Sequence, residues 1–172
     1  MAAAVDTEAR LRILGIDPGS RVTGYGVIDK VGHQLRFVSC GAIRVAAGRP
    51  LPERLKEIHD GIGEVIATLR PDVAAVEEIF VAVNPRSALT LGHARGVLIL
   101  SCMQQGLAVH EYPARVVKQA VAGSGRAAKA QVQQMVRALL TLSGVPSEDA
   151  ADALAVALCH ANHCNGLRRV VS

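Results

Sequence analysis

Apolar residues alternate with polar ones, or follow one another directly, in three successive segments near the start of the chain. These segments are predicted to be β-strands at residues 12–17, 22–31 and 34–46. The turn dipeptide Pro18-Gly19 joins the first two segments and directs the second strand back along the first. Two short apolar runs further along the chain predict two more strands, at 73–80 and 107–111.

Apolar positions spaced by three and four residues predict helices in the rest of the chain. The expected helices are 52–70, 86–105, 113–121 (with Pro113 in its first turn), 128–142 and 148–163. This order of elements is typical of an α/β protein with a mixed five-stranded sheet and helices on both faces. We expect one domain at 12–163, between a flexible N-terminal tail at 1–11 and a C-terminal tail at 164–172.

Composition and charge narrow the class of protein further. The chain has 172 residues, and no stretch approaches the roughly 18 uninterrupted apolar residues of a membrane-spanning helix. The N-terminus lacks the basic start and apolar core of a secretory signal, so a soluble, cytoplasmic protein is expected. A net charge of +4 is compatible with a polyanionic partner. The four cysteines show no disulfide-framework spacing, and free thiols suit the cytoplasm.

Acidic residues stand at the ends of elements that are otherwise apolar. Asp17 ends the first strand and Glu77 lies near the end of the fourth, while Asp149 and Asp152 share one face of the last helix. Each has a structural explanation, because Asp favours the opening of a Pro-Gly turn and acids favour helix N-termini. Buried carboxylates are nevertheless costly unless they are paired or bind metal. Together the four acids therefore favour a Mg²⁺ or Mn²⁺ site suited to phosphodiester chemistry.

Four stretches resemble the RuvC family of bacterial Holliday-junction resolvases. They read ILGIDPGSRVTGYGVI, VEEIFVAVNPRSALTLGHARG, YPARVVKQAVAG and DAADALAVALCH. The resemblance covers residues 12–163 and implies a ribonuclease H-like fold. It also implies a Mg²⁺-dependent endodeoxyribonuclease that resolves Holliday junctions by paired nicks in recombination and DNA repair, leaving 5′-phosphate and 3′-hydroxyl ends.

The resemblance also assigns roles to individual residues. The metal-binding catalytic carboxylates would be Asp17, Glu77, Asp149 and Asp152. Lys118 and Lys129 would bind DNA near the scissile strand, Lys129 also acting in catalysis, and Phe80 would sit at the junction crossover. Two Mg²⁺ ions per subunit are expected, with Mn²⁺ as a substitute. The implied partners are a four-way DNA junction, a second copy of the chain and the RuvA-RuvB branch-migration complex, with no membrane.

Other interpretations stay open at this point. The first hairpin also suits one lobe of an actin- or sugar-kinase-like ATPase, although 172 residues supply only one of the two lobes needed. A junction-binding protein without catalysis is a third possibility.

The segment CHANHC at 159–164 contains zinc-ligand residue types, but one helix cannot direct all four side chains at one point. Helix 86–105 is apolar over much of its circumference, which suits either the core or a dimer face.

Overall fold

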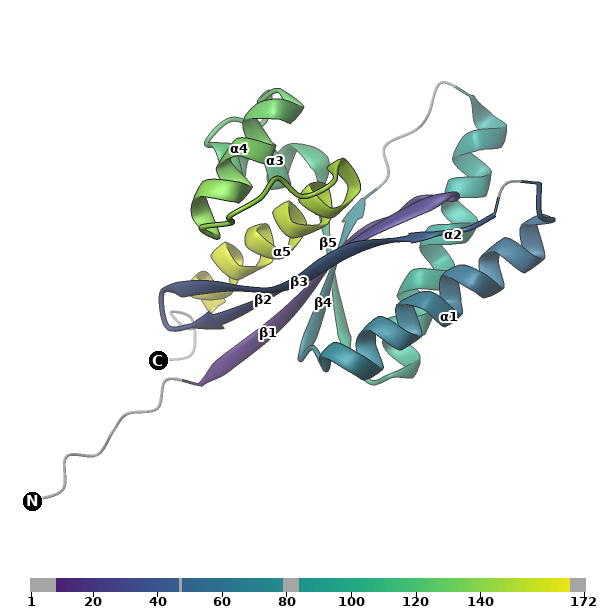
Figure 1. Cartoon of the computed structure of the whole chain (residues 1–172), viewed down its shortest axis with the longest axis horizontal. Helices are drawn as coiled ribbons and strands as arrows, with labels where there is room; N and C mark the ends of the chain where they lie inside the picture. Colours follow the sequence, from purple (N-terminus) through teal and green to yellow (C-terminus); the bar gives the residue numbers. More distant parts are fainter. Residues whose placement is uncertain (1–8, 47, 79–83, 168–172) are drawn as a thin grey trace, which may run out of the picture.

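A five-stranded sheet with the strand order β3-β2-β1-β4-β5 forms the centre of the molecule (Figure 1). The computed structural model describes residues 9–46, 48–78 and 84–167. For residues 165–167 it describes only the helical backbone. The strands are β1 (Arg10–Asp17), β2 (Val22–Val31), β3 (Gln34–Arg44), β4 (Val73–Glu78) and β5 (Ala108–Pro113). Strands β1, β2 and β3 are antiparallel neighbours, whereas β4 runs parallel to both β1 and β5.

Helices cover both faces of this sheet, as Figure 1 shows. They are α1 (Leu51–Leu69), α2 (Pro85–Gln104), α3 (Ala114–Ala122), α4 (Lys129–Leu139) and α5 (Glu148–Leu167). Helices α1 and α2 lie on one face, and α3, α4 and α5 lie on the other. The predicted mixed α/β sheet with helices on both faces is therefore confirmed. Within the described residues, none of the helices is both long and apolar enough to cross a membrane.

Several predicted element boundaries are wrong by a few residues. Helix α4 ends at Leu139 rather than at 142, since Thr141 adopts a left-handed backbone with φ 52°. Pro113 closes β5 and precedes α3 instead of lying in the first turn of that helix. Strand β1 begins at Arg10 and α5 continues to Leu167, so both elements extend into the predicted tails. Residues 79 and 80, predicted as the end of the fourth strand, lie outside the described residues.

Large aliphatic side chains fill the layer between the sheet and helices α1 and α2. Ile58, Ile62 and Ile66 recur at helical spacing on α1 and are buried against the sheet. Leu14 and Ile16 of β1 point into the same core. In this layer, branched side chains therefore separate the helices from the sheet, as is usual where a helix packs on a sheet.

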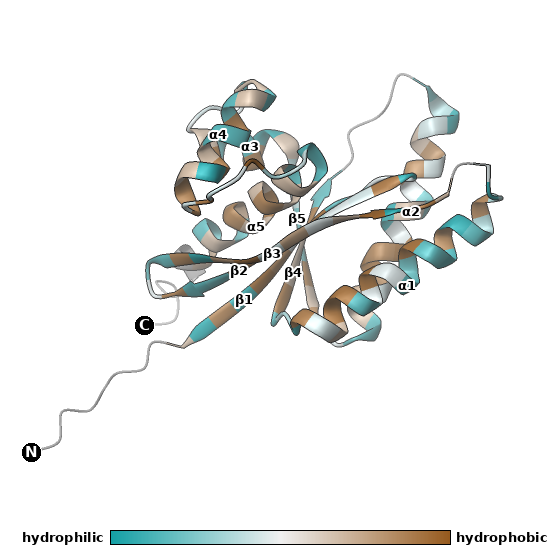
Figure 2. Ribbon diagram, in the orientation of Figure 1, coloured by the Kyte–Doolittle hydropathy of each residue, from teal (hydrophilic) through white to brown (hydrophobic). Residues whose placement is uncertain are grey.

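Small residues line the contact between α5 and the other face of the sheet. A Cβ atom on Gly15 of β1 would stand 2.1 Å from the Ala153 carbonyl oxygen, and one on Gly24 of β2 would stand 2.0 Å from that of Asp149. The helix backbone therefore lies directly on the strands. Figure 2 shows the middle of α5 as an apolar segment, and its residues from Ala153 to Cys159 are buried.

Candidate active site

Parallel pairing of β1 and β4 places two carboxylates at the same edge of the sheet. Ile16 of β1 is paired with Val76 of β4, so the residues that follow them lie at the same level: Asp17 ends β1, and Glu77 is the last residue but one of β4. This edge is the carboxyl end of the parallel strands, where open α/β sheets bind their ligands.

The turn after Asp17 is held by neighbouring groups. The Thr23 hydroxyl donates a hydrogen bond to the Gly19 carbonyl over 2.9 Å. Arg54 of α1 donates from Nε to the Ser20 carbonyl over 3.2 Å. The backbone that carries Asp17 is therefore fixed from both the sheet and α1.

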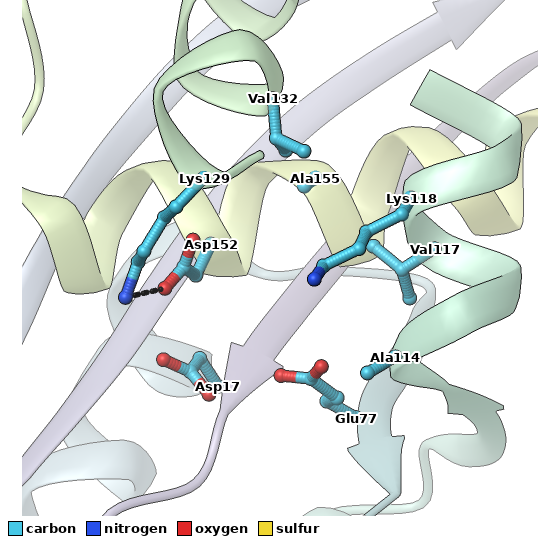
Figure 3. A pocket seen from close by; sticks show the side chains of 9 residues that line it. All are labelled: Asp17, Glu77, Ala114, Val117, Lys118, Lys129, Val132, Asp152 and Ala155. Carbon is cyan, nitrogen blue, oxygen red and sulfur yellow. Dashed lines mark ion pairs between the residues drawn. The ribbon is translucent and has the colours of Figure 1, made fainter. Parts of the chain in front are cut away.

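Helix α5 brings a third carboxylate, Asp152, to this edge. Because Gly24 has no side chain, the Asp149 backbone lies directly against β2, and the first turn of α5 is therefore close to the ends of the strands. The Asp152 side chain is 22% exposed and lies above Asp17 in Figure 3, on the cavity that Asp17 and Glu77 also line. Carboxylates distant in sequence thus meet at one place.

A cavity of about 350 Å³ lies among these carboxylates (Figure 3). It is lined by Asp17, Glu77, Ala114, Val117, Lys118, Lys129, Val132, Asp152 and Ala155. Asp17 and Glu77 lie on one side of this cavity in Figure 3, Asp152 lies beside Lys129, and the two lysines extend into the cavity from α3 and α4. The cavity thus combines negative charge for a cation with positive charge for an anion.

Burial and like charge favour protonation of the two strand-end acids. Burial, with the negative charges of Glu77 and Asp152, raises the pKa of Asp17 to about 8. Burial also raises the pKa of Glu77, although a hydrogen bond with Asp17 and the positive charges of Lys118 and Lys129 oppose this shift. Asp17 and Glu77 therefore share a proton more readily than they both ionise.

Lys129 neutralises the third acid. Its Nζ lies 2.9 Å from Asp152 Oδ2 and also pairs with Glu148. Burial lowers the pKa of Lys129, but the hydrogen bonds to Glu148 and Asp152 outweigh it and raise the pKa overall. Burial raises the pKa of Asp152 despite this ion pair. Lys129 is accordingly a permanent cation within the cavity.

The other predicted site residues lie in different places. Asp149 is half-buried and does not line the cavity, yet its charge contributes to the raised pKa values of Asp17 and Asp152. Lys118 lines the cavity opposite Glu77. Phe80 lies outside the described residues. The structure therefore brings together Asp17, Glu77, Asp152 and the two lysines, with Asp149 next to them.

The donor set fits a hard divalent cation. Three carboxylates around one cavity supply the oxygen ligands that Mg²⁺ and Mn²⁺ prefer. Burial, together with neighbouring negative charges, raises the pKa values of all three acids, and a bound divalent cation would offset this cost of ionisation. In the described residues no three His, Cys, Asp or Glu side chains already converge on one metal position. The Asp152 carboxylate is directed toward Lys129, with which it forms an ion pair.

The cysteine and histidine residues of α5 form contacts of their own. His160 is buried, accepts or donates a 2.8 Å hydrogen bond with the Tyr112 hydroxyl, and stacks on His110 at 4.5 Å between ring centroids. Burial, with the charges of neighbouring groups, lowers the pKa of His160 to about 4. Cys164 Sγ lies 3.1 Å from His160 Nε2, whereas His163 is beside Cys159. The two pairs lie on different faces of α5, in agreement with the expectation that one helix cannot direct all four side chains at one point.

Sequence reasoning missed residues that support the site from behind. Arg95 of α2 donates from Nε to the Glu77 carbonyl oxygen over 3.2 Å and pairs with Glu111 of β5. Tyr112 is paired with Glu77 in the sheet. Arg95 was visible in the sequence as a charged residue within an apolar helix. Its partner could not be predicted, because the acceptor is a main-chain oxygen, which every residue has.

Comparison with known proteins identifies the family. Residues 13–160 match the family model described as crossover junction endodeoxyribonuclease RuvC. The RuvC protein of Aromatoleum aromaticum is 56% identical over 163 residues, covering 95% of this chain and 88% of that protein. The RuvC protein of Syntrophotalea carbinolica is 60% identical over 154 residues, covering 90% of this chain and 95% of that protein. The Thermus thermophilus RuvC structure in complex with Holliday junction substrate superposes with a TM-score of 0.84 and 36% identity, covering 91% of this chain and 96% of that one. The chain belongs to the RuvC family of crossover junction endodeoxyribonucleases.

Proposed function

We propose that this chain resolves four-way DNA junctions in recombination and repair by paired, metal-dependent nicks that leave 5′-phosphate and 3′-hydroxyl ends. The observation that carries the proposal is the meeting of Asp17, Glu77 and Asp152 around one cavity, with Lys118 and Lys129 beside them. A site that brings acids and cations together around one cavity suits a metal ion and the phosphate on which it acts. Family membership supplies the substrate class.

The carboxylates have the metal-binding role in this proposal. Asp17, Glu77 and Asp152 would hold two Mg²⁺ ions, with Asp149 completing the set from the first turn of α5, and Mn²⁺ would substitute. When bound, such ions supply an activated water and stabilise the leaving oxygen. Asp17 is central because it lines one cavity with Glu77 and Asp152, where burial and the charges of these two acids raise its pKa.

The lysines have a phosphate-binding role. Lys118 and Lys129 lie on α3 and α4, across the cavity from the sheet edge. Lys129 stays protonated at every pH at which the enzyme would work, because its partners raise its pKa. An ammonium group held there can stabilise charge that develops on the phosphate, or orient the phosphate before reaction.

Helix α2 provides the surface for a homodimer. Leu89 is 65% exposed and Leu100 is 53% exposed, and both line an apolar groove between α1 and α2. Apolar surface of this kind is typical of an interface. A two-fold dimer would present two cavities to one junction, as paired nicks require. Phe80 at the crossover, cytoplasmic location and cooperation with a RuvA-RuvB complex complete the proposal on the basis of the family resemblance.

The direct experiment compares a synthetic four-way junction with a linear duplex of the same arm sequence. With Mg²⁺ we expect symmetric nicks in the junction, resealable by ligase, and no cleavage of the duplex or in EDTA. Tight junction binding without cleavage in either Mg²⁺ or Mn²⁺ would instead indicate a non-catalytic binding protein. Phosphate release from ATP, measured in parallel, would favour the kinase-like interpretation.

A further inference from the structure

Arg95 connects helix α2 to the two strands behind the active site. Its Nε donates to the Glu77 carbonyl oxygen over 3.2 Å, and its Nη2 lies 2.8 Å from Glu111 Oε2. Helix α2 is on the opposite face of the sheet from the helices that line the cavity. One guanidinium therefore joins α2, β4 and β5 at the residue that carries a cavity carboxylate.

The burial of Arg95 indicates that these contacts matter. Its side chain is only 20% exposed, and a guanidinium loses hydration when it is buried. Nη2 and Glu111 are at ion-pair distance, but Nη2 has no hydrogen-bond partner in the described part of the chain. The directional contact of Arg95 is thus the one to the Glu77 main chain.

Glu77 needs such support because the sheet holds it from one side. The pairing of β1 with β4 stops at Ile16 and Val76, one residue before Glu77. On the other side Glu77 is paired with Tyr112 of β5. A rotation of the Glu77 peptide would change the direction in which its carboxylate enters the cavity, and Arg95 opposes that rotation.

We propose that Arg95 is a positioning residue for Glu77. By holding the Glu77 carbonyl oxygen it fixes the carboxylate in the direction that metal binding requires. The inference rests on the proposed function, since Glu77 is taken to be a metal ligand. Groups that orient metal ligands typically change metal affinity or activity by about 10–100-fold when removed.

The test uses Arg95→Gln and Arg95→Lys, with metal binding and cleavage measured separately. For Arg95→Gln we expect junction cleavage to fall about 10–100-fold and the Mg²⁺ concentration that gives half of the metal-induced rise in Tm to increase. Junction affinity should stay within about twofold, because phosphate contacts lie elsewhere. Arg95→Lys keeps the charge but not the planar fork, so its cleavage and Mg²⁺ requirement should lie between those of the wild type and Arg95→Gln.

Two further variants separate positioning from loss of charge or stability. Arg36→Gln removes a cation at the opposite end of the sheet, where Arg36 contacts Gln34, and should leave cleavage and the Mg²⁺ requirement unchanged. In a Glu77→Gln background, Arg95→Gln should cause no further loss of the Mg²⁺-induced Tm rise, because both changes act through one group.

The outcomes distinguish this inference from the proposed function. Wild-type cleavage and Mg²⁺ response in Arg95→Gln, or additive losses in the double variant, would show that Arg95 does not position Glu77. A wild-type protein that leaves junctions uncut would overturn the proposed function instead. Should Arg95→Gln fail to fold, Arg95→Lys carries the same two measurements, and an unchanged Mg²⁺ requirement in it would overturn the inference.

Discussion

The two faces of the sheet are packed in different ways. On the α1 and α2 face, branched side chains such as Ile58 and Ile62 keep the helices at a distance from the strands. On the other face α5 lies with its backbone on the strands, because Gly15 and Gly24 offer no side chain. Side chains can repack when a neighbour changes, whereas main-chain atoms in contact cannot.

The site is built on the face with the closer packing. Asp152 reaches the strand-end carboxylates because α5 is close to β1 and β2. The other face supplies support through longer side chains, such as Arg54 to the turn after Asp17 and Arg95 to Glu77. Close backbone contact thus sets the position of α5 and its carboxylate, and arginine contacts fix the strand ends.

Filling the close contact should have the largest effect on stability. For Gly15→Ala, the new Cβ would stand 2.1 Å from the Ala153 carbonyl oxygen and 2.6 Å from the Ala157 nitrogen. Because α5 must move away, we expect a loss of about 3 kcal/mol in the free energy of unfolding, with reduced cleavage. Urea denaturation of the variant and the wild type gives the difference.

Gly63→Ala on α1 is the matched control on the other face. The nearest atom to its new Cβ is the Gln105 side-chain amide nitrogen at 3.3 Å, the end of a flexible side chain. The better helix propensity of alanine should raise stability by up to about 1 kcal/mol. Equal losses in Gly15→Ala and Gly63→Ala would contradict the difference between the two faces.

A smaller effect should come from the charges on the close-packed face. The pKa of Asp17 is raised to about 8, so the folded protein binds a proton that the unfolded chain releases near pH 4. Stability without metal should therefore fall as the pH rises toward 8. His160, whose pKa is lowered to about 4, acts in the opposite direction only below about pH 6.5. Above pH 6.5, His59 acts in the same direction as Asp17, because hydrogen bonds to Gln104 and Asp60 raise its pKa, so the Asp17→Asn variant is needed to separate the two groups.

Over that range we expect a loss of at most about 2 kcal/mol in EDTA, and a flatter profile in Asp17→Asn. Unfolding by urea at several pH values measures both. A wild-type profile that is flat or rises between pH 6.5 and 8 would show that Asp17 is ionised in the folded protein.

The smallest effect on the fold is expected from the outer surface of α2. Leu100 is 53% exposed, so Leu100→Glu should change the stability of one subunit by no more than about 0.5 kcal/mol. It should, however, place a charge in the apolar groove and convert a dimer into monomers that no longer nick in pairs. Sedimentation velocity measures the mass. The control Val145→Glu, at an exposed position between α4 and α5, should leave the mass of the assembly unchanged. If the wild type is itself a monomer, the groove does not form a dimer interface.

The elements were predictable from sequence because each has a strong pattern of its own. Alternation predicted the hairpin strands, and helical spacing on α1 predicted the face that Ile58, Ile62 and Ile66 bury. The positions of Asp17 and Glu77 followed from their places at strand ends, since parallel strands bring such residues to one edge. Asp152 followed from its place in an apolar helix.

Other features depend on contacts that leave no pattern. Gly15 and Gly24 appeared as ordinary strand residues, because only the tertiary fold brings the Ala153 and Asp149 backbones against them. The hydrogen bond from Arg95 goes to a main-chain oxygen. The end of α4 depends on the left-handed conformation of Thr141, which a non-glycine residue rarely adopts.

Cleavage of a four-way junction by Asp152→Asn, compared with Glu148→Gln, tests directly whether α5 supplies a metal ligand. Both acids lie on α5 and pair with Lys129, but only Asp152 lines the cavity. We predict that Asp152→Asn binds the junction with nearly wild-type affinity and loses at least about 1,000-fold in Mg²⁺-dependent cleavage, a loss of the size seen when a group at the reacting centre is removed. Glu148→Gln should keep most of the activity. Near-wild-type cleavage by Asp152→Asn, or equal losses in the two variants, would contradict the assignment of α5 to the active site.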